Sequence, residues 1–280
     1  MRAARARAPV VLAVLAALMG VGGGEVWGAD AAGAPGTAAP PPLEDNGFLV
    51  EEAYNQEARV VQHIFNWARF EPSGDHVLAF SQEWPLFGQR HQLAYSIPFQ
   101  SLGGASRGTG WGDVEIQYRY QWLGIDGSPL AAAPEFTLLL PTGDPGENLG
   151  AGAAGGEVGL PLSARLSSRF VAHTNLSVTY TGENGGTPAT MEYDLGQSLV
   201  WLMASRFNPL VELTWSRSEP AGGGAGAERE EIFLVSPGFR WGHDFESGLQ
   251  IVPGIAFPIG IGASSGDAGV LLYLSFEHGF

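Results

Sequence analysis

The sequence contains no cysteine and no lysine. Without cysteine, the chain can form neither a disulfide framework nor a thiolate metal site. All fourteen basic residues are arginines, and they stand against 29 acidic residues, so the net charge is −15. Nucleic-acid binding depends on basic patches, and we therefore expect no nucleic-acid partner. Stability must come from backbone pairing and packing.

Long apolar runs are also scarce. The stretch from Pro9 to Val21 follows three arginines and precedes small residues, which is the layout of a secretory signal peptide. At about 13 residues, it falls short of the roughly 20 that a retained helical anchor needs. We therefore predict a cleaved signal peptide at residues 1–28. No later stretch has the length of a helical span, which excludes a helical inner-membrane protein.

The residues after the leader divide into two parts. Residues 29–43 are mostly Ala, Gly and Pro, a composition that buries little surface and predicts a flexible linker. We assign residues 29–58 to this linker together with a periplasmic N-terminal segment. Residues 59–280 form the second part, which has a different residue pattern.

The strand pattern begins at Arg59. Segments rich in aromatic and branched residues alternate with clusters of Gly, Pro, Asp, Asn and Ser. Within residues 113–122, apolar and polar side chains alternate strictly, as they do in a strand with two unlike faces. Residues 91–100 and 170–181 repeat the pattern. Helical spacing would mix the two sets of side chains.

Three features favour a membrane barrel over a soluble sandwich. Gaps after odd-numbered strands are mostly long and Gly-rich, whereas gaps after even-numbered strands are short, as expected of outer loops and periplasmic turns. The last segment, residues 270–280, ends in a phenylalanine, which resembles the C-terminal signal of outer-membrane proteins. Six tryptophans lie near predicted strand ends, where indole rings favour the lipid–water boundary: Trp84, Trp111, Trp122, Trp201, Trp215 and Trp241.

The predicted fold of residues 59–280 is therefore all-β: a transmembrane antiparallel β-barrel of about twelve strands in the bacterial outer membrane. The barrel must be closed, because a strand in hydrocarbon has to pair every amide and carbonyl. Several prolines, which lack a donor, fall within or beside the strands and indicate ends or bulges. The predicted strands are 59–70, 76–84, 91–100, 111–122, 130–140, 157–166, 170–181, 191–202, 208–217, 232–241, 248–258 and 270–280.

Two stretches of the chain resemble a known family. Residues 48–57 (FLVEEAYNQE), followed by residues 60–64 (VVQHI), resemble the opening segment of the outer-membrane transporter family named for the meta-pathway of phenol degradation. Residues 140–144 (LPTGD) resemble that family's second recurring element. The resemblance covers about residues 46–280 and implies an outer-membrane protein that passes small organic, including aromatic, compounds. Residues 58–59 depart from the pattern, which leaves the register of the first strand open.

A twelve-stranded barrel encloses a lumen between the filled eight-stranded type and the open sixteen-stranded porin. We expect a channel that passively admits small organic molecules, with aromatic or hydrophobic compounds as candidate substrates. Acids and arginines that face each other in the lumen would orient polar solutes. The predicted pore-lining residues are Asp113, Glu115, Gln117, Arg119, Glu135, Arg165, His173, Asn175, Glu212 and Arg240.

The alternative is a structural or adhesive barrel whose lumen is filled by salt bridges. A second open question is the N-terminal segment, which could close the periplasmic mouth or lie on its rim. If it is a plug, deletion of residues 30–57 should raise conductance. The possible plug residues are Glu51, Glu52, Tyr54, Asn55 and Gln56.

An outer-membrane phospholipase is a third candidate, because some twelve-stranded barrels carry Ser, His and Asn on the outer wall. His173 and Asn175 share a face here, with Ser163 and Ser177 nearby in sequence, yet the predicted facing turns His173 into the lumen. We therefore predict no enzyme and no catalytic residue.

No metal or cofactor is expected either. The six histidines have no metal-ligand spacing. The Gly-rich loop at residues 150–156 does not lead into a helix, as a phosphate-binding loop would. The partners we expect are outer-membrane lipid and lipopolysaccharide, the barrel-assembly machinery and a small organic solute.

Overall fold

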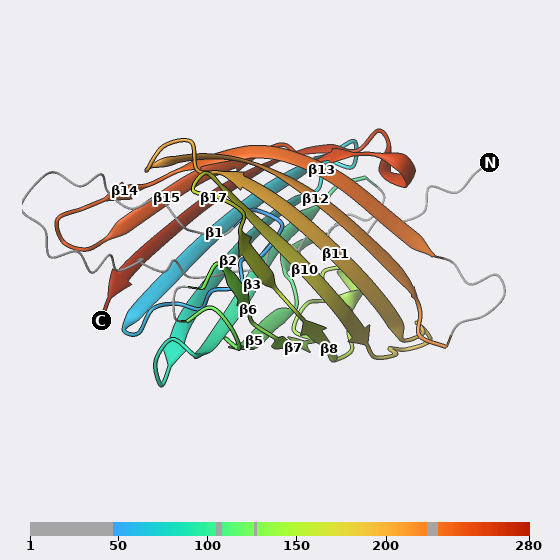
Figure 1. Cartoon of the computed structure of the whole chain (residues 1–280). Helices are drawn as coiled ribbons and strands as arrows, with labels where there is room; N and C mark the ends of the chain where they lie inside the picture. Colours follow the sequence, from blue (N-terminus) through green and yellow to red (C-terminus); the bar gives the residue numbers. More distant parts are fainter. Residues whose placement is uncertain (1–46, 105–107, 126–127, 223–228) are drawn as a thin grey trace, which may run out of the picture.

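The computed structural model describes residues 47–104, 108–125, 128–222 and 229–280 (Figure 1). The predicted signal peptide and residues 29–46 of the predicted linker lie outside the described residues. Within the described ranges, no helix has the length and apolar character of a membrane span. Two short 3-10 helices, η1 (Pro145–Glu147) and η2 (Gly262–Ser264), are found in loops.

The strands of the described residues group into twelve spans, because several spans are interrupted once. Their bounds are β1 (Val60–Glu71), β2 (His76–Leu86), β3 (His91–Leu102), β4 (Gly108–Trp111) with β5 (Val114–Tyr120), β6 (Leu130–Ala132) with β7 (Glu135–Leu140), β8 (Gly155–Gly159) with β9 (Leu162–Arg165), β10 (Phe170–Thr181), β11 (Thr190–Trp201), β12 (Phe207–Pro220), β13 (Glu230–Trp241) with β14 (His243–Asp244), β15 (Gln250–Ala256) with β16 (Ile259–Gly260), and β17 (Ala268–Gly279). The predicted number of strands and their approximate positions are confirmed.

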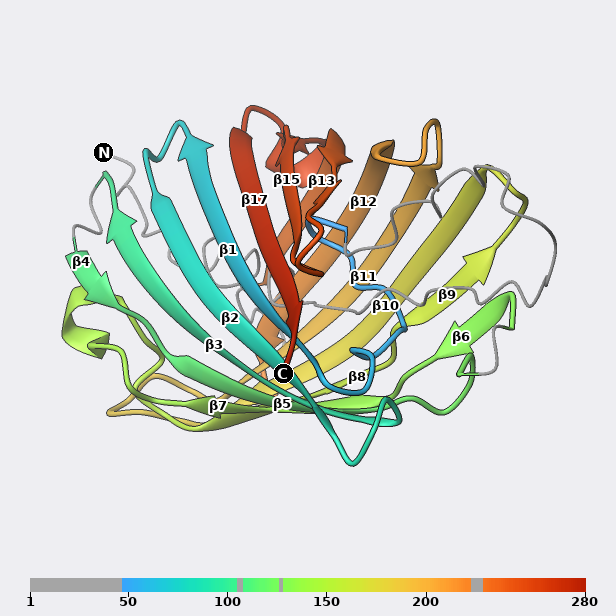
Figure 2. The same ribbon diagram turned by 90° about the vertical axis from the view of Figure 1, so that its left-hand side faces the viewer.

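The sheet closes on itself. Each span pairs antiparallel with the next, and β17 pairs with β1 from Val60↔Gly279 to Glu71↔Ala268. The strands lie side by side and tilted around one axis (Figures 1 and 2). Closure gives every wall strand a hydrogen-bonding neighbour on both sides, which is the condition for a sheet in a bilayer.

Prolines mark several interruptions of the wall, because proline cannot donate to the ladder. Pro134 separates β6 from β7, Pro161 separates β8 from β9, and Pro258 lies between β15 and β16. Other prolines are accommodated inside strands, namely Pro98, Pro209, Pro237 and Pro253.

The two faces of the wall have opposite character, as the alternation predicts. On β5, Ile116 and Tyr118 are exposed on the outside, whereas Gln117 and Arg119 are buried on the inside. Large apolar side chains are exposed on the outer face of most other spans. The wall therefore presents an apolar surface to lipid and a largely polar surface to its lumen.

Four of the six tryptophans lie at the end of the barrel where β1 begins: Trp84, Trp122, Trp201 and Trp241. The other two lie farther inside their spans than predicted. Trp111 does so because β4 already begins at Gly108, and Trp215 because β12 continues to Pro220. Trp215 follows Phe207 by about eight residues, close to the roughly 9–11 that cross a bilayer, so both rings can lie at interfaces.

The ends of the barrel are assigned from the connections between spans. The connections from Leu140 to Gly155, Thr181 to Thr190 and Pro220 to Glu230 all lie opposite the end where β1 begins. Outer-membrane barrels place long loops outside and short turns in the periplasm, so this is the extracellular end. The connection from Tyr120 to Leu130 is longer than the predicted periplasmic turn, because β5 ends earlier than predicted. The connection from Leu102 to Gly108 is shorter than the predicted outer loop, because β3 ends later and β4 begins earlier than predicted.

A charge on the outer face should destabilise the barrel. Leu176 is 45% exposed on the outside of β10, near the middle of its span. We expect Leu176→Arg to lower the free energy of unfolding by about 2–4 kcal/mol, because an arginine near the bilayer midplane loses its hydration. Urea unfolding in lipid vesicles, followed by tryptophan fluorescence, measures the change.

The matched control is Leu166→Arg, which places the same charge at an exposed position in a periplasmic turn. Its expected effect is about 0–1 kcal/mol. Equal destabilisation by the two variants would contradict the assignment of Leu176 to the lipid face.

Candidate functional site in the barrel lumen

The residues before β1 lie inside the barrel. We refer to residues 47–58 as the inner segment. Most of its side chains are buried although it belongs to no strand, and Figure 2 shows it in blue, crossing the interior before it joins β1. Since it has no strand partner, its backbone must be hydrogen-bonded by something else.

The inner segment begins against two glycines of the wall. The ring of Phe48 lies beside Gly238 on β13 and Gly254 on β15, where a Cβ atom would overlap it. It also contacts Tyr273 on β17 in an edge-on arrangement, with ring centroids 5.8 Å apart. Glycine is therefore required at both positions for the backbone of the wall to approach an aromatic ring closely.

Glu212 on β12 anchors the next turn of the segment. Its carboxylate accepts hydrogen bonds from the N–H groups of Phe48 at 3.0 Å, Leu49 at 3.0 Å and Val50 at 3.2 Å. A carboxylate has about four acceptor positions, so three donors can be accommodated. Glu212 is fully buried, and Arg240 on β13 acts on it electrostatically. One side chain thus replaces the neighbouring strand that these three amides lack.

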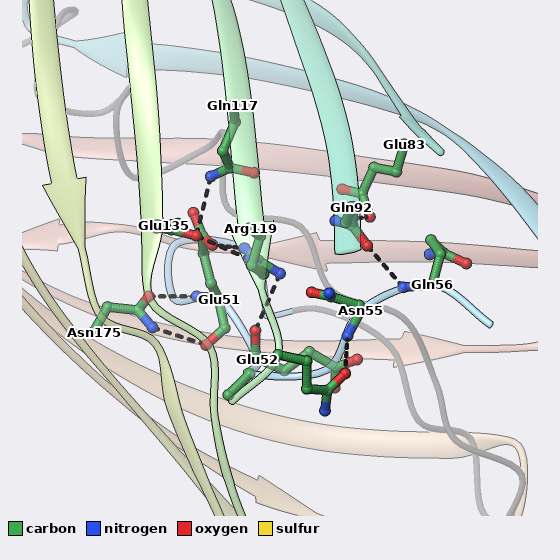
Figure 3. A network of polar contacts seen from close by, with 12 residues as sticks. Glu51, Glu52, Asn55, Gln56, Glu83, Gln92, Gln117, Arg119, Glu135 and Asn175 are labelled. Atoms are coloured by element: carbon green, nitrogen blue, oxygen red, sulfur yellow. Dashed lines mark hydrogen bonds and ion pairs between the residues drawn. The ribbon is translucent and has the colours of Figure 1, made fainter. Parts of the chain in front are cut away.

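Side chains of two further strands bind the middle of the segment. The Asn175 side chain on β10 accepts from the N–H of Glu51 and donates to its carbonyl oxygen at 2.9 Å (Figure 3). Ser163 Oγ on β9 accepts from the N–H of Ala53 at 2.8 Å. An amide side chain that both donates and accepts reproduces the two bonds of a strand pair.

Two glutamines bind the last part of the segment. Gln121 Oε1 accepts from the N–H of Asn55 at 2.9 Å, and Gln92 Oε1 on β3 accepts from the N–H of Gln56 at 2.7 Å. The Gln56 side chain in turn donates to Gln62 on β1. Figure 3 shows the Gln92 side chain bonded to the backbone of Gln56. The segment therefore follows the inside of the wall from β13 to β1, held by one polar side chain after another.

Arg119 on β5 joins the segment to the wall by charge. It is fully buried and forms ion pairs with Glu51 of the segment and with Glu135 on β7, the latter at 2.9 Å. Gln117 donates to the same Glu135 carboxylate at 3.2 Å. One cation thus pairs with two acids (Figure 3), and burial strengthens their attraction because the surrounding dielectric is low.

Ser163 and His173 form a buried polar pair. Their Oγ and Nδ1 atoms are 2.8 Å apart, and each residue is 2% exposed. The pair faces the lumen and lies under the inner segment, since Ser163 also binds the backbone of Ala53. This position differs from the outer wall on which the phospholipase hypothesis depends.

All ten residues that the sequence predicted for the lumen are on the inner face of the wall. The buried ones are Gln117, Arg119, Glu135, His173, Glu212 and Arg240, and the partly exposed ones are Asp113, Glu115, Arg165 and Asn175. The five predicted plug residues are all buried inside the barrel: Glu51, Glu52, Tyr54, Asn55 and Gln56.

Asp113 has a structural role in addition. Its carboxylate accepts from the N–H groups of Gly143 at 2.8 Å and Ala151 at 2.7 Å, which fixes the loop between β7 and β8. Residues of the inner wall that sequence reasoning did not select as site residues include Gln92, Gln121, Ser163, Glu157 and Asp194. Strand alternation places all five inward, so the signal was present in the pattern.

The lumen wall is not polar throughout. One buried apolar cluster includes Phe48, Leu49, Ile64, Leu234 and Leu271, which come from the inner segment and from β1, β13 and β17. Among the described residues, no group of three or more His, Cys, Asp or Glu side chains could hold a metal ion.

A closed twelve-stranded antiparallel wall, apolar outside and largely polar inside, defines the chain as an outer-membrane β-barrel. Its apolar outer face lies in lipid. Residues 44–260 match the model of the family described as "Putative MetA-pathway of phenol degradation", and the chain belongs to this family. Both sequence stretches that resemble the family lie within the matched residues.

Solved structures share the fold. An outer-membrane channel from Pseudomonas putida F1 has a TM-score of 0.60 and 10% identity, with 81% of this chain and 98% of that chain covered. The NanC porin has a TM-score of 0.52 and 8% identity, with 78% and 100% covered. At these identities the likeness concerns the fold. No curated protein matches the chain.

Proposed function

We propose that this protein is a passive outer-membrane channel for small organic molecules, and that the inner segment is a plug that regulates access to the periplasm. The observation that carries the proposal is the way in which the segment is held. It is bound by side chains such as Glu212, Asn175 and Gln92, and by no strand pairing. Such contacts can break without opening the wall, because the barrel's own ladder does not include the segment.

The lumen beside the segment supports a path for solutes. A cavity of about 60 Å³ beside the segment is lined by Leu49, Glu51 and residues of β7, β8 and β10–β13, and it opens to solvent. Release of the segment would widen this space. The apolar cluster on one side favours solutes with a hydrophobic or aromatic part, in agreement with the family's description.

An enzymatic role is not proposed. The Ser163–His173 pair is covered by the inner segment, and the Ser163 oxygen is engaged by the amide of Ala53. Neither group faces lipid, where a phospholipid ester would have to bind. The proposal therefore includes no catalytic residue and no cofactor. The barrel-assembly machinery and lipopolysaccharide are proposed as partners in the outer membrane.

Planar bilayers test the channel function. We expect purified, folded protein without its leader to give discrete conductance steps, because breaking the side-chain contacts of the segment would open the lumen. Liposomes containing the protein should swell in small organic solutes faster than empty liposomes. The control is the same protein added after denaturation by heat. Absence of both conductance and uptake would reject the channel and favour the structural or adhesive barrel with a filled lumen.

A further inference from the structure

Acidic side chains gather on the extracellular side of the inner segment. The strand register places Gln117, Thr137, Glu157, Thr179 and Glu192 side by side across β5, β7, β8, β10 and β11. In the adjacent row, toward the periplasm, the same register aligns Arg119, Glu135, Ser177 and Asp194. Glu115 lies on the inner face of β5, two residues before Gln117 and closer to the extracellular end. We call Glu115, Glu157, Glu192 and Asp194 the acidic wall.

The acidic wall has no basic partner among the described residues. Its carboxylates act on one another electrostatically, as Glu115 does with Glu157 and Glu192 with Asp194. Their hydrogen bonds come from hydroxyls, with Thr179 donating to Glu157 at 2.8 Å and Ser177 to Asp194 at 3.2 Å. Within the described part of the chain, none of the four has an ion pair.

A neighbouring amide adds an unused acceptor to this surface. Gln117 is 7% exposed, and its Nε2 donates to Glu135, whereas its Oε1 has no hydrogen-bond partner among the described residues. Buried acceptors are normally paired, so an unpaired one beside several carboxylates indicates that a donor is missing. The surface therefore offers carboxylates and a hydrogen-bond acceptor without a matching cation.

An apolar surface lies beside the acidic wall in the same cavity. The cavity described above is lined by Glu157 and Asp194, by Ile232 and Leu234 of β13, and by Leu49 of the inner segment. Ile232 and Leu234 also line a second, smaller cavity that contains Asp75 and Asp267 near the extracellular end. The two cavities thus share Ile232 and Leu234, and each also contains acids.

We propose that this cavity is a binding site for organic cations in which a positively charged nitrogen is attached to an aromatic or branched apolar body. This inference rests on the proposed channel function only for the route by which the ligand arrives. Acids between walls of low dielectric concentrate cations and repel anions. The nitrogen would lie against Glu157 and Asp194, and the apolar body would replace water on Ile232 and Leu234.

Calorimetric titration of the folded protein in detergent micelles tests the site. The probe is benzyltrimethylammonium, whose charge is permanent. We expect it to bind, and we expect tetramethylammonium to bind about tenfold more weakly, because it lacks a ring to bury. Benzenesulfonate, which has a similar ring and the opposite charge, should not bind. Equal binding of benzyltrimethylammonium and benzenesulfonate, or no binding of either, would overturn the proposal.

Two variants separate the contributions of the walls. The double substitution Glu157→Gln/Asp194→Asn should weaken benzyltrimethylammonium binding at least about tenfold, because it removes both nearest charges. Leu234→Thr should weaken benzyltrimethylammonium more than tetramethylammonium. The matched control is Glu183→Gln/Glu246→Gln, which removes two charges from exposed loop positions and should leave binding unchanged. If the acidic-wall variant binds like the control, the proposal is wrong.

Folding and channel function are followed separately. Heat-modifiable gel mobility verifies that each variant folds into a barrel. If the double variant does not fold, Glu157→Gln alone replaces it, with a smaller expected loss of affinity. Reversal potentials in a salt gradient should show cation selectivity that decreases in the double variant. Selective binding without conductance would overturn the channel and uphold the site, whereas conductance without selective binding would overturn the site alone.

Discussion

Deletion of residues 30–57 should increase single-channel conductance severalfold. The inner segment occupies the periplasmic half of the lumen, with Phe48, Leu49, Ala53 and Asn55 all buried there. Its removal frees the cross-section that those side chains fill, and conductance rises with the open area of a pore. The wall itself keeps its pairing, because β1 still meets β17 and β2. Planar bilayers measure the change directly.

The result has a clear control. Replacing residues 30–46 by an unrelated Gly-Ser sequence of equal length leaves the inner segment in place, and conductance should then stay at the level of the full chain. An unchanged conductance after deletion of residues 30–57, in a barrel that still shows heat-modifiable mobility, would show that the inner segment does not limit the flow of ions.

The second large effect is expected at Glu212. Glu212→Leu removes the acceptor of three buried N–H groups, those of Phe48, Leu49 and Val50. A buried donor without an acceptor costs about 1–3 kcal/mol, so the docked segment should lose at least about 3 kcal/mol relative to the released one. This corresponds to roughly a hundredfold rise in the released population. Glu212→Gln should have an intermediate effect, since it retains one acceptor oxygen.

Cleavage by a glutamate-specific protease measures release, because Glu51 and Glu52 are buried in the docked segment. When docking is fast relative to cleavage, the cleavage rate follows the released population. Ser236→Ala is the matched control. Ser236 lies directly opposite Glu212 on β13, is fully buried, and its Oγ has no hydrogen-bond partner among the described residues. Cleavage of Glu212→Leu at the rate of Ser236→Ala would refute the anchoring role.

The wall was predictable because its physics is local and periodic. Alternation along residues 113–122 is enough to turn Gln117 and Arg119 inward and Ile116 and Tyr118 outward, and the structure confirms this facing. Turn-forming clusters delimit the spans, and the need to pair every amide in lipid requires closure. The same reasoning could have selected Glu157 and Asp194, which occupy inward positions of β8 and β11.

The path of the inner segment could not be predicted, because its partners are distant in sequence and unrelated by any period. Phe48 and Glu212 are 164 residues apart, and Glu51 and Asn175 are 124 apart. Glu212 looks like any other inward acid in the sequence. Only the closed wall brings these side chains to the points where the segment's amides need acceptors. The tryptophans were a poor guide to the strand ends, because spans such as β12 continue several residues past the tryptophan.

The seam between β1 and β17 has a consequence for biogenesis. The inner segment is continuous with β1, whereas the strand that completes the ring is β17, more than two hundred residues later. The segment is therefore attached to the growing sheet long before the barrel is closed, and it must be enclosed when β1 and β17 pair. Slow pairing of these two strands would leave the residues of the segment exposed to proteolysis in the periplasm.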